Sequence, residues 1–229
     1  MNEKCHTFLE LSNLFSSHGY HLYLVGGTVR DILLNVELTD MDTVTDATPE
    51  QMKIFLDGDY TFSKFGSVKY KINNVKFDIT TLRKESKYDD HRHPLKIKYI
   101  KKLKDDHYRR DFTINAMYMD SSFKLYDYEN GLDDLNNRVL KMVGNPKKRI
   151  KEDPLRILRA IRFYLTYDLT FDKSLKNALI KSRKFINYIP KDKYKMECDK
   201  MINIYKNKCQ NFSNIYSIDE YIQKGLWID

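Results

Sequence analysis

The feature of this chain that most constrains its fold is a strand-like run that ends in two glycines and continues into a short helical stretch. His21–Val25 has the composition of a strand, Gly26 and Gly27 follow, and Thr28–Leu34 has the pattern of a helix. Glycines placed before a helix let backbone N–H groups approach a phosphate closely. The pattern predicts a strand, turn and helix that can bind a phosphate, although a Gly-Gly pair alone is commonly just a turn.

Two aspartates separated by one residue follow shortly afterwards. If Thr39–Val44 is extended, its period of two places Asp40 and Asp42 on the same face of a strand. Carboxylate oxygens are the ligands that Mg²⁺ prefers. A lone Asp-x-Asp is often a solvated loop, but its position after the glycine turn favours neighbouring metal and phosphate sites. That combination indicates nucleotidyl transfer.

The composition bounds the class of protein. The 229 residues, 41% of them hydrophobic, suffice for one or two compact domains. The net charge of +8 fits a polyanionic partner, although lysine-rich usage also accompanies AT-rich genomes. Cys5, Cys198 and Cys209 have neither disulfide-framework nor metal-ligand spacing, which favours a reduced compartment. Without a signal peptide or a transmembrane run, we expect a cytoplasmic protein with no membrane partner.

The remaining patterns predict a mixed α/β part and then a helical part. We expect a helix over residues 4–18, a helix that starts at Thr48 and Pro49 and runs to Leu56, and a hairpin of Lys69–Ile72 and Val75–Thr80 joined by Asn73 and Asn74. Residues 84–108 read as a mobile charged loop with a strand near Lys96–Ile100, Arg109–Tyr118 as a helix, and Lys124–Tyr126 as a strand that returns to the sheet.

Asp78 is a third candidate carboxylate. It alternates with Phe77 and Ile79, so it faces away from the core side of its strand and can lie near Asp40 and Asp42. Three carboxylates can hold two Mg²⁺ ions, one lowering the pKa of an attacking 3′-hydroxyl and the other neutralising the leaving pyrophosphate. The alternative is an exposed strand aspartate without a role.

The clearest helical pattern begins at Pro154. An apolar stripe of Ile157, Leu158, Ile161 and Leu165 covers one side of the helix, and polar residues three apart form a slanted ridge on the other: Asp153, Arg156, Arg159 and Arg162. Such a ridge can read a base edge, because Asp accepts a hydrogen bond from an exocyclic amine and Arg donates to a ring acceptor. Cytosine and adenine both carry that amine. The alternative is a solvated arginine face with acids at the helix cap.

These segments resemble one family, the class II tRNA nucleotidyltransferases and bacterial poly(A) polymerases. The matching motifs are Gly-Gly-Thr-Val-Arg-Asp at 26–31, Thr-Asp-Met-Asp at 39–42, Arg-Arg-Asp-Phe-Thr-Ile-Asn-Ala-Met at 109–117 and Glu-Asp-Pro-Leu-Arg at 152–156. The resemblance implies an α+β fold, with an N-terminal nucleotidyltransferase (polymerase beta-like) mixed sheet and then an all-helical part. It implies a head domain at 1–130 and a helical neck domain at 131–229, with the family's body and tail reduced or absent.

The resemblance also implies roles for individual residues. The catalytic set is Asp40, Asp42 and Asp78, with Mg²⁺ as cofactor on Asp40 and Asp42. The family most often has Glu at the position of Asp78. The residues that contact the nucleotide are Gly27, Arg30, Arg110, Asp153, Arg156, Arg159 and Arg162. Asp153 and Arg156 would act as the amino-acid template for CTP and ATP, and Arg109 would form a structural ion pair.

The implied activity is CCA addition, with the tRNA 3′ end, CTP and ATP as partners. CC addition, A addition and poly(A) synthesis share the same motifs and remain alternatives, as does a non-catalytic RNA-binding remnant. Family members usually continue beyond this length. Lysine-rich surfaces, or a homodimer that replaces the missing region, are two ways in which tRNA could be held.

Overall fold

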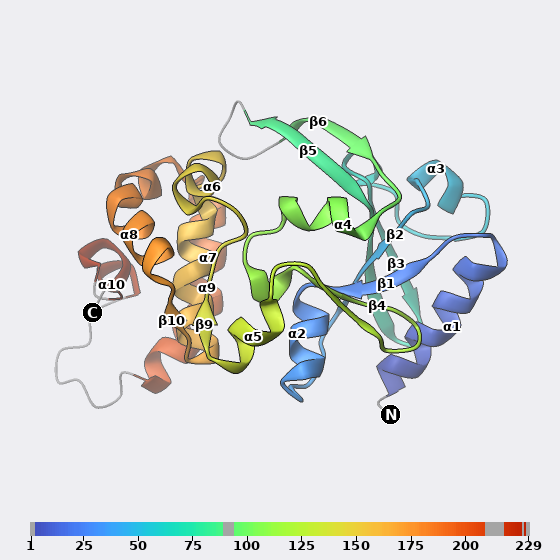
Figure 1. The fold of residues 1–229 in the computed structure, drawn as a ribbon, viewed down its shortest axis with the longest axis horizontal. Helices are drawn as coiled ribbons and strands as arrows, with labels where there is room; N and C mark the ends of the chain where they lie inside the picture. The colour runs from blue at the N-terminus through green and yellow to red at the C-terminus, as the bar shows by residue number, and fades with distance from the viewer. Residues whose placement is uncertain (1–2, 89–93, 209–217, 226, 228–229) are drawn as a thin grey trace. The chain divides into compact units, whose positions relative to one another are not determined.

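The structure is a computed structural model that describes residues 3–88, 94–208, 218–225 and Trp227. The chain divides into two compact units. The first comprises residues up to Lys87 together with Pro94–Leu132, and the second begins at Asp133 (Figure 1). Each unit is described by itself. None of the helices in the described part of the chain is long and apolar enough to cross a membrane.

A six-stranded mixed sheet forms the centre of the first unit, in the order β3-β4-β2-β1-β7-β8. Its strands are β1 (Leu22–Val25), β2 (Met41–Thr45), β3 (Ser67–Ile72), β4 (Val75–Thr81), β7 (Met117–Met119) and β8 (Leu125–Asp127). The pairing of β2 with β4 is parallel, and the other pairings are antiparallel. The mixed sheet predicted for this part of the chain is confirmed.

The hairpin of β3 and β4 follows the prediction closely. Asn73 and Asn74 join the two strands, and both have positive φ angles, 47° and 62°. Positive φ at both central residues is the geometry of a type I′ turn, which asparagine tolerates well. The hairpin fixes the register of β4, and through the parallel pairing it sets which residues of β2 and β4 stand side by side.

The two faces of the sheet are covered differently. Helix α1 (Glu3–Ser17) packs on the sheet through fully buried apolar side chains such as Phe8, Leu11 and Phe15. On the face that carries Val25, Val44 and Tyr118, a smaller cluster includes Leu103 of helix α4 (Leu103–Asp106). That cluster covers only part of its face, so the polar residues of β2 and β4 on the same side remain accessible.

Several predicted elements differ from the structure. The helix expected from Thr48 to Leu56 is only α3 (Pro49–Met52), although Thr48 caps it as predicted. The segment expected to be a mobile charged loop instead contains β5 (Arg83–Tyr88) and α4, while residues 89–93 lie outside the described residues. The strand expected near Lys96–Ile100 is present as β6 (Pro94–Tyr99).

The predicted helix over Arg109–Tyr118 is wrong. The structure has two 3₁₀ turns, η2 (His107–Arg109) and η3 (Thr113–Asn115), before β7 begins at Met117. Arg110 and Phe112 are extended, and Phe112, Thr113, Ile114 and Ala116 are all buried. From Phe112 to Met119 every residue is buried, so this segment lacks the exposed face that an amphipathic helix has.

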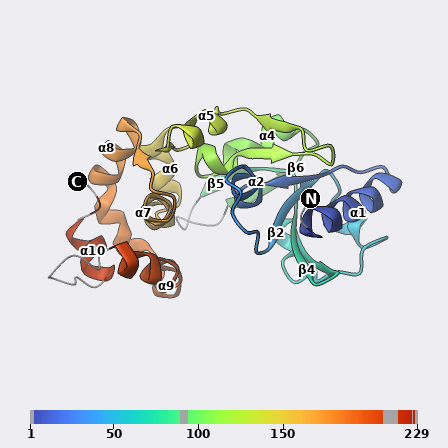
Figure 2. The same ribbon diagram turned by 90° about the horizontal axis from the view of Figure 1, so that it is seen from below.

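The second unit is helical, as predicted. Its elements are α6 (Pro146–Glu152), α7 (Leu155–Tyr167), α8 (Lys173–Ser182), η4 (Arg183–Tyr188), α9 (Lys191–Lys208) and α10 (Ile218–Lys224). Helix α7 packs beside α9, and α6 beside α8 (Figure 2). The prediction omitted one feature, a two-residue parallel pairing of β9 (Val139–Leu140) with β10 (Thr170–Phe171). Trp227 is buried against Phe171 and is a packing residue.

Candidate active site

The glycine turn lies directly beside Asp42. Gly26 has a φ of +63°, which glycine adopts without strain, and α2 (Gly27–Leu33) starts at the next residue. A methyl group built on Gly27 would lie 3.6 Å from the Oδ2 atom of Asp42. The backbone N–H of Asp42 donates to the Thr28 hydroxyl at 2.8 Å, which fixes the start of β2 against this turn. A phosphate at the turn would therefore lie next to this carboxylate.

Asp42 and Asp78 stand side by side on the sheet. They are register partners in the parallel pairing of β2 with β4, so their side chains project from the same face. That face is opposite the one on which Phe77 and Ile79 are buried, as predicted for Asp78.

The strand expected over Thr39–Val44 is β2, which begins only at Met41, so Asp40 immediately precedes the strand. Asp40 and Asp78 line one cavity of about 480 Å³. In the part of the chain that the structure describes, no three His, Cys, Asp or Glu side chains form a ready-made metal group. The structure thus places Asp42 beside Asp78, and Asp40 and Asp78 in the lining of one cavity. As an accessible set of hard oxygen donors on adjacent strands they fit Mg²⁺.

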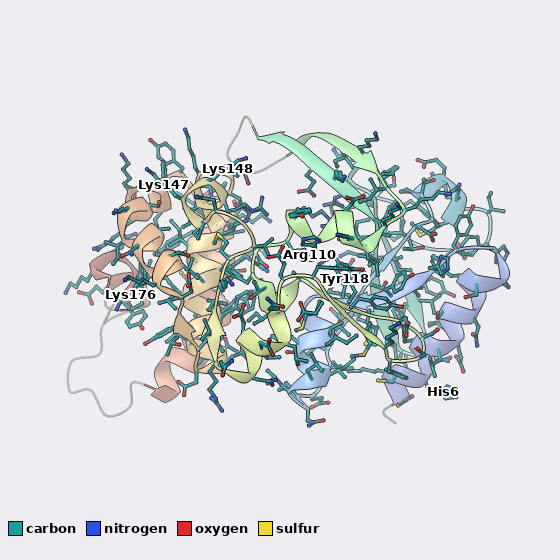
Figure 3. The ribbon with its side chains drawn as sticks, in the orientation of Figure 1. His6, Arg110, Tyr118, Lys147, Lys148 and Lys176 are labelled. Carbon is teal, nitrogen blue, oxygen red and sulfur yellow. The ribbon has the colours of Figure 1, made fainter. Side chains whose placement is uncertain are left out.

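Arg110 precedes β7, the strand that neighbours β1 on the side away from β2. It lies beside the glycine turn. Its guanidinium lies over the ring of Tyr118, 5.0 Å from the centroid, and its Nε donates to the Tyr118 hydroxyl at 3.0 Å (Figure 3). A methyl group built on Gly26 would lie 3.5 Å from Nη1 of Arg110. A cationic guanidinium is therefore available beside the turn and near Asp42.

Asp106 holds this arginine in place. Its fully buried carboxylate accepts hydrogen bonds from Arg110 Nη2 at 3.2 Å, Arg109 Nε at 2.7 Å and the Tyr118 hydroxyl at 2.9 Å. The backbone N–H of Arg83 donates to it at 3.0 Å. The structural ion pair predicted for Arg109 is confirmed. The sequence prediction missed Asp106, although its i,i+3 and i,i+4 spacing to the two arginines was a usable signal.

The electrostatics of this group are those of a tightly paired network. Burial raises the pKa of the Asp106 carboxyl, but Arg109 and Arg110 outweigh burial and hold that pKa well below its usual range. Burial lowers the pKa of Arg110, but Tyr118 and the carboxylates of Asp106 and Asp42 raise it above its ordinary value. Arg110 is therefore a permanent cation next to the carboxylate pair.

Arg30 is engaged within the first unit. It is buried, pairs with Asp31 at 2.9 Å and donates from Nη1 to the Asn115 side chain at 2.5 Å. Its Nη2 lies 3.4 Å from the position of a methyl group on Gly27. Arg30 joins the two motifs at 26–31 and 109–117 while it keeps part of its guanidinium at the glycine turn.

In the second unit, Asp153 and Arg156 lie at the start of α7. Oδ1 of Asp153 accepts from the backbone N–H of Leu155 at 3.1 Å, so this aspartate also caps the helix. Arg156 is buried, donates to the carbonyl of Arg149 at 2.7 Å and lies 3.6 Å from a carboxylate oxygen of Glu152. The polar ridge predicted from the sequence is therefore not exposed to solvent along its whole length.

The other two arginines of the predicted ridge lie along the same helix. The guanidinium carbon atoms of Arg159 and Arg162 lie 5.3 Å and 4.3 Å from the centroid of the Phe163 ring. Arg162 Nε donates to the buried carboxylate of Glu197 on α9 at 2.7 Å. Lys200 pairs with the same carboxylate at 2.9 Å. Burial raises the pKa of Glu197, but Arg162 and Lys200 outweigh it and lower that pKa overall.

A mixed sheet with a glycine turn, paired aspartates and a clamped arginine defines a nucleotidyltransferase-type head. Residues 22–141 match the model of the poly A polymerase head domain, and the chain belongs to this family. It is 37% identical over 203 residues to the CCA-adding enzyme of Geobacillus sp. (strain WCH70), covering 88% of this chain and 50% of that relative. It is also 37% identical to the CCA-adding enzyme of Staphylococcus epidermidis, covering 92% of this chain and 57% of the relative.

Solved structures give the same result. The crystal structure of the Bacillus stearothermophilus CCA-adding enzyme in complex with CTP matches with a TM-score of 0.78 and 27% identity, over 90% of this chain and 49% of that one. A tRNA nucleotidyltransferase complexed with a primer tRNA and an incoming ATP analog matches with a TM-score of 0.68 and 27% identity, over 93% and 62%. The chain spans about half the length of the curated relatives it matches.

Proposed function

We propose that this chain is a template-independent tRNA nucleotidyltransferase that adds CMP and AMP to the 3′ end of tRNA. The observation that carries the proposal is the meeting of three features on one face of the first unit. These are the Gly26–Gly27 turn, the Asp42–Asp78 carboxylate pair and the Arg110 guanidinium. Together they supply a phosphate site, oxygen ligands for a divalent cation and a fixed positive charge.

The reaction is a phosphoryl transfer. The 3′-hydroxyl oxygen of tRNA attacks the α-phosphorus of CTP or ATP, a new phosphodiester bond forms, and the bond to the pyrophosphate oxygen breaks. The hydroxyl proton passes to solvent, and pyrophosphate carries away the negative charge. Gly27 and Arg110 would contact the triphosphate, and Arg30 would support the turn between them.

The residues that would hold the metal are Asp40 and Asp42, with Asp78 assisting. Mg²⁺ bound there would lower the pKa of the 3′-hydroxyl and neutralise charge on the leaving pyrophosphate. Asp42 and Asp78 are fixed by strand pairing, so the protein orients these ligands before the substrates arrive. Asp40 precedes the strand and can adjust to the ion.

Base selection belongs to the second unit in this proposal. Asp153 would accept a hydrogen bond from the exocyclic amine of cytosine or adenine, and Arg156 would donate to the neighbouring ring acceptor. Arg159 and Arg162 would complete the nucleotide contacts. The hydrogen bonds of Arg156 to Arg149 and of Arg162 to Glu197 restrict both guanidinium groups, which suits a template of fixed shape.

The relatives support the substrates. Structures that match this chain are a complex with CTP and a complex with a primer tRNA and an ATP analog, and the curated relatives are CCA-adding enzymes. These relatives favour CCA addition over poly(A) synthesis. A tRNA substrate and cysteines without disulfide spacing are consistent with action in the cytoplasm.

The test is primer extension on a tRNA that ends before its CCA. We expect the chain to add two nucleotides with CTP alone and a third when ATP is also present, in Mg²⁺. Asp42→Ala should abolish extension, whereas Asp46→Ala, at the other end of β2, should preserve it. Extension that persists in Asp42→Ala would contradict the metal site, and only CMP or only AMP addition would indicate a partial activity.

A further inference from the structure

A cavity over the outer strands of the first unit has the features of a strand-binding groove. Besides Asp40 and Asp78, its lining includes three lysines of the hairpin, Lys69, Lys71 and Lys76. Lys69 is the register partner of Asp78, and Lys71 is the partner of Lys76, so all four side chains project from one face. All three lysines are exposed. A row of cations thus continues outward from the carboxylate pair.

The geometry of phosphoryl transfer tells which substrate approaches from this side. The attacking and leaving oxygens must be roughly in line through the phosphorus. The glycine turn and Arg110 lie on the β1 and β7 side of Asp42, and they mark where the triphosphate and its leaving group would lie. The attacking 3′-hydroxyl must then come from the opposite side, which is that of β4 and β3.

An exposed aromatic side chain lies at the same edge. Phe62 is 47% exposed, and its ring centroid is 5.7 Å from the Nζ atom of Lys69. Lysines that follow a backbone, together with an aromatic ring on which a base can stack, are the usual means of holding a single strand. Lys69 and Phe62 are close enough together for one nucleotide to place its phosphate on the lysine and its base on the ring.

Four aspartates also line the cavity: Asp40, Asp57, Asp59 and Asp78. Asp40 and Asp78 are the proposed metal ligands. Asp59 is already engaged, since its Oδ1 accepts from the backbone N–H and the hydroxyl of Thr61 at 2.9 Å and 2.6 Å. These hydrogen bonds lower its pKa, so it stays an anion whose charge Lys69 balances in part. The remaining lysines, Lys71 and Lys76, face the groove.

We propose that the single-stranded 3′ end of the acceptor RNA runs along β4 and β3, with its phosphates on Lys69, Lys71 and Lys76 and one of its bases on Phe62. This inference rests on the proposed function and gives the RNA a path to the carboxylates. It assigns to the hairpin a role in binding RNA, separate from the binding of CTP or ATP.

The experiment measures RNA binding without catalysis. A fluorescently labelled tRNA that ends before its CCA is titrated with the 229-residue chain in the absence of nucleotides, over a range of salt concentrations. Lys69→Ala/Lys71→Ala is compared with Lys53→Ala/Lys124→Ala, a matched control because it removes two lysines that, like Lys69, lie over aromatic rings but do not line the cavity. CTP affinity is measured separately by calorimetry.

We expect the hairpin double variant to bind RNA about tenfold more weakly, with the slope of log K against log salt reduced by about 1.4 for two lost contacts. Phe62→Ala should weaken binding about fivefold or more without changing that slope. CTP affinity should be unchanged in both. Unchanged RNA affinity in these variants, or no RNA binding by the unaltered chain, would overturn the inference.

A loss of CTP affinity in the hairpin double variant would also overturn it, because the lysines would then bind the triphosphate. The proposed function can fail separately. If the unaltered chain binds the tRNA through these residues but extends it with neither CTP nor ATP, the RNA path stands and the activity does not.

Discussion

At the scale of single residues, Asp106 connects several side chains of the first unit. Its one buried carboxylate pairs with Arg109 and Arg110 and accepts from the hydroxyl of Tyr118. Loss of a buried partner of two guanidinium groups is much more costly than the loss of a surface pair. In the proposed function Asp106 would act on the nucleotide through Arg110, which would make it a positioning residue.

Asp106→Asn should lower the free energy of unfolding by about 3–5 kcal/mol, because it removes the buried carboxylate that pairs with both Arg109 and Arg110. The matched control is Asp105→Asn, since Asp105 is half-buried and pairs with the exposed Lys84. Thermal unfolding of both variants at neutral pH checks this. Equal midpoints would contradict the role of Asp106.

The stabilisation that Asp106 provides should also depend on pH. The pKa of Asp106 is lower in the folded state than its unfolded value near 3.9. Its contribution is therefore complete above about pH 4 and is lost as the pH falls toward the native pKa. The stability of the unaltered protein should fall more steeply below pH 4 than that of Asp106→Asn, and parallel curves would count against the ion pair.

At the scale of elements, the sequence predicted those features that depend on interactions between residues close together in the chain. The β3–β4 hairpin, the Thr48 cap and the amphipathic α7 were all found where expected, because turn geometry, capping and periodicity each act within a few residues. The segment 109–118 could not be predicted in this way, since it is buried on all sides by residues distant in sequence. The start of β2 at Met41, after Asp40, depends likewise on its pairing with β4.

The sequence predicted which types of residue form the candidate site, but it did not predict most of the contacts that these residues make. The alternation around Asp78 was enough to place it on the accessible face, but no pattern revealed that Arg156 and Arg162 are held by Arg149 and Glu197. The pairing of Arg162 with Glu197 joins α7 to α9, whose positions are 35 residues apart in the chain. Contacts of that range depend on how helices pack, which one sequence does not show.

Glu197→Gln should destabilise the second unit by about 3 kcal/mol, because Arg162 loses a buried counter-charge. Asp199→Asn is the matched control, since it removes one carboxylate from the exposed side of the same helix. Thermal unfolding should show a lower midpoint for Glu197→Gln alone. If the two variants unfold together, the ion pair does not hold α7 against α9.

The start of α7 permits a separate test of base selection. If Asp153 reads the exocyclic amine, Asp153→Ala should relax the preference against UTP and GTP by about ten- to a hundredfold, because those bases present a carbonyl where the carboxylate needs a hydrogen-bond donor. Asp153→Ser keeps an acceptor for the backbone N–H of Leu155 but cannot reach a base. Serine should therefore restore stability without restoring selectivity. If serine restored both stability and selectivity, Asp153 would act only as a helix cap.

At the scale of the whole molecule, the two units divide the chemistry. The first carries the carboxylates, the glycine turn and the clamped arginine, and the second carries the residues proposed to read the base. The match to the poly A polymerase head domain ends at residue 141, so it covers the first unit and only the beginning of the second. In the proposed function, the first unit would carry out nucleotidyl transfer, and the choice of cytosine and adenine would depend on the second.

The central claim is tested most directly by sequencing the product formed on a defined tRNA that lacks CCA, with all four nucleoside triphosphates and Mg²⁺ present. The account predicts that the chain adds C, C and A in that order and then stops, and that Asp42→Ala adds nothing. A long tail of adenylates, random incorporation of the four nucleotides, or no incorporation by the unaltered chain would contradict it.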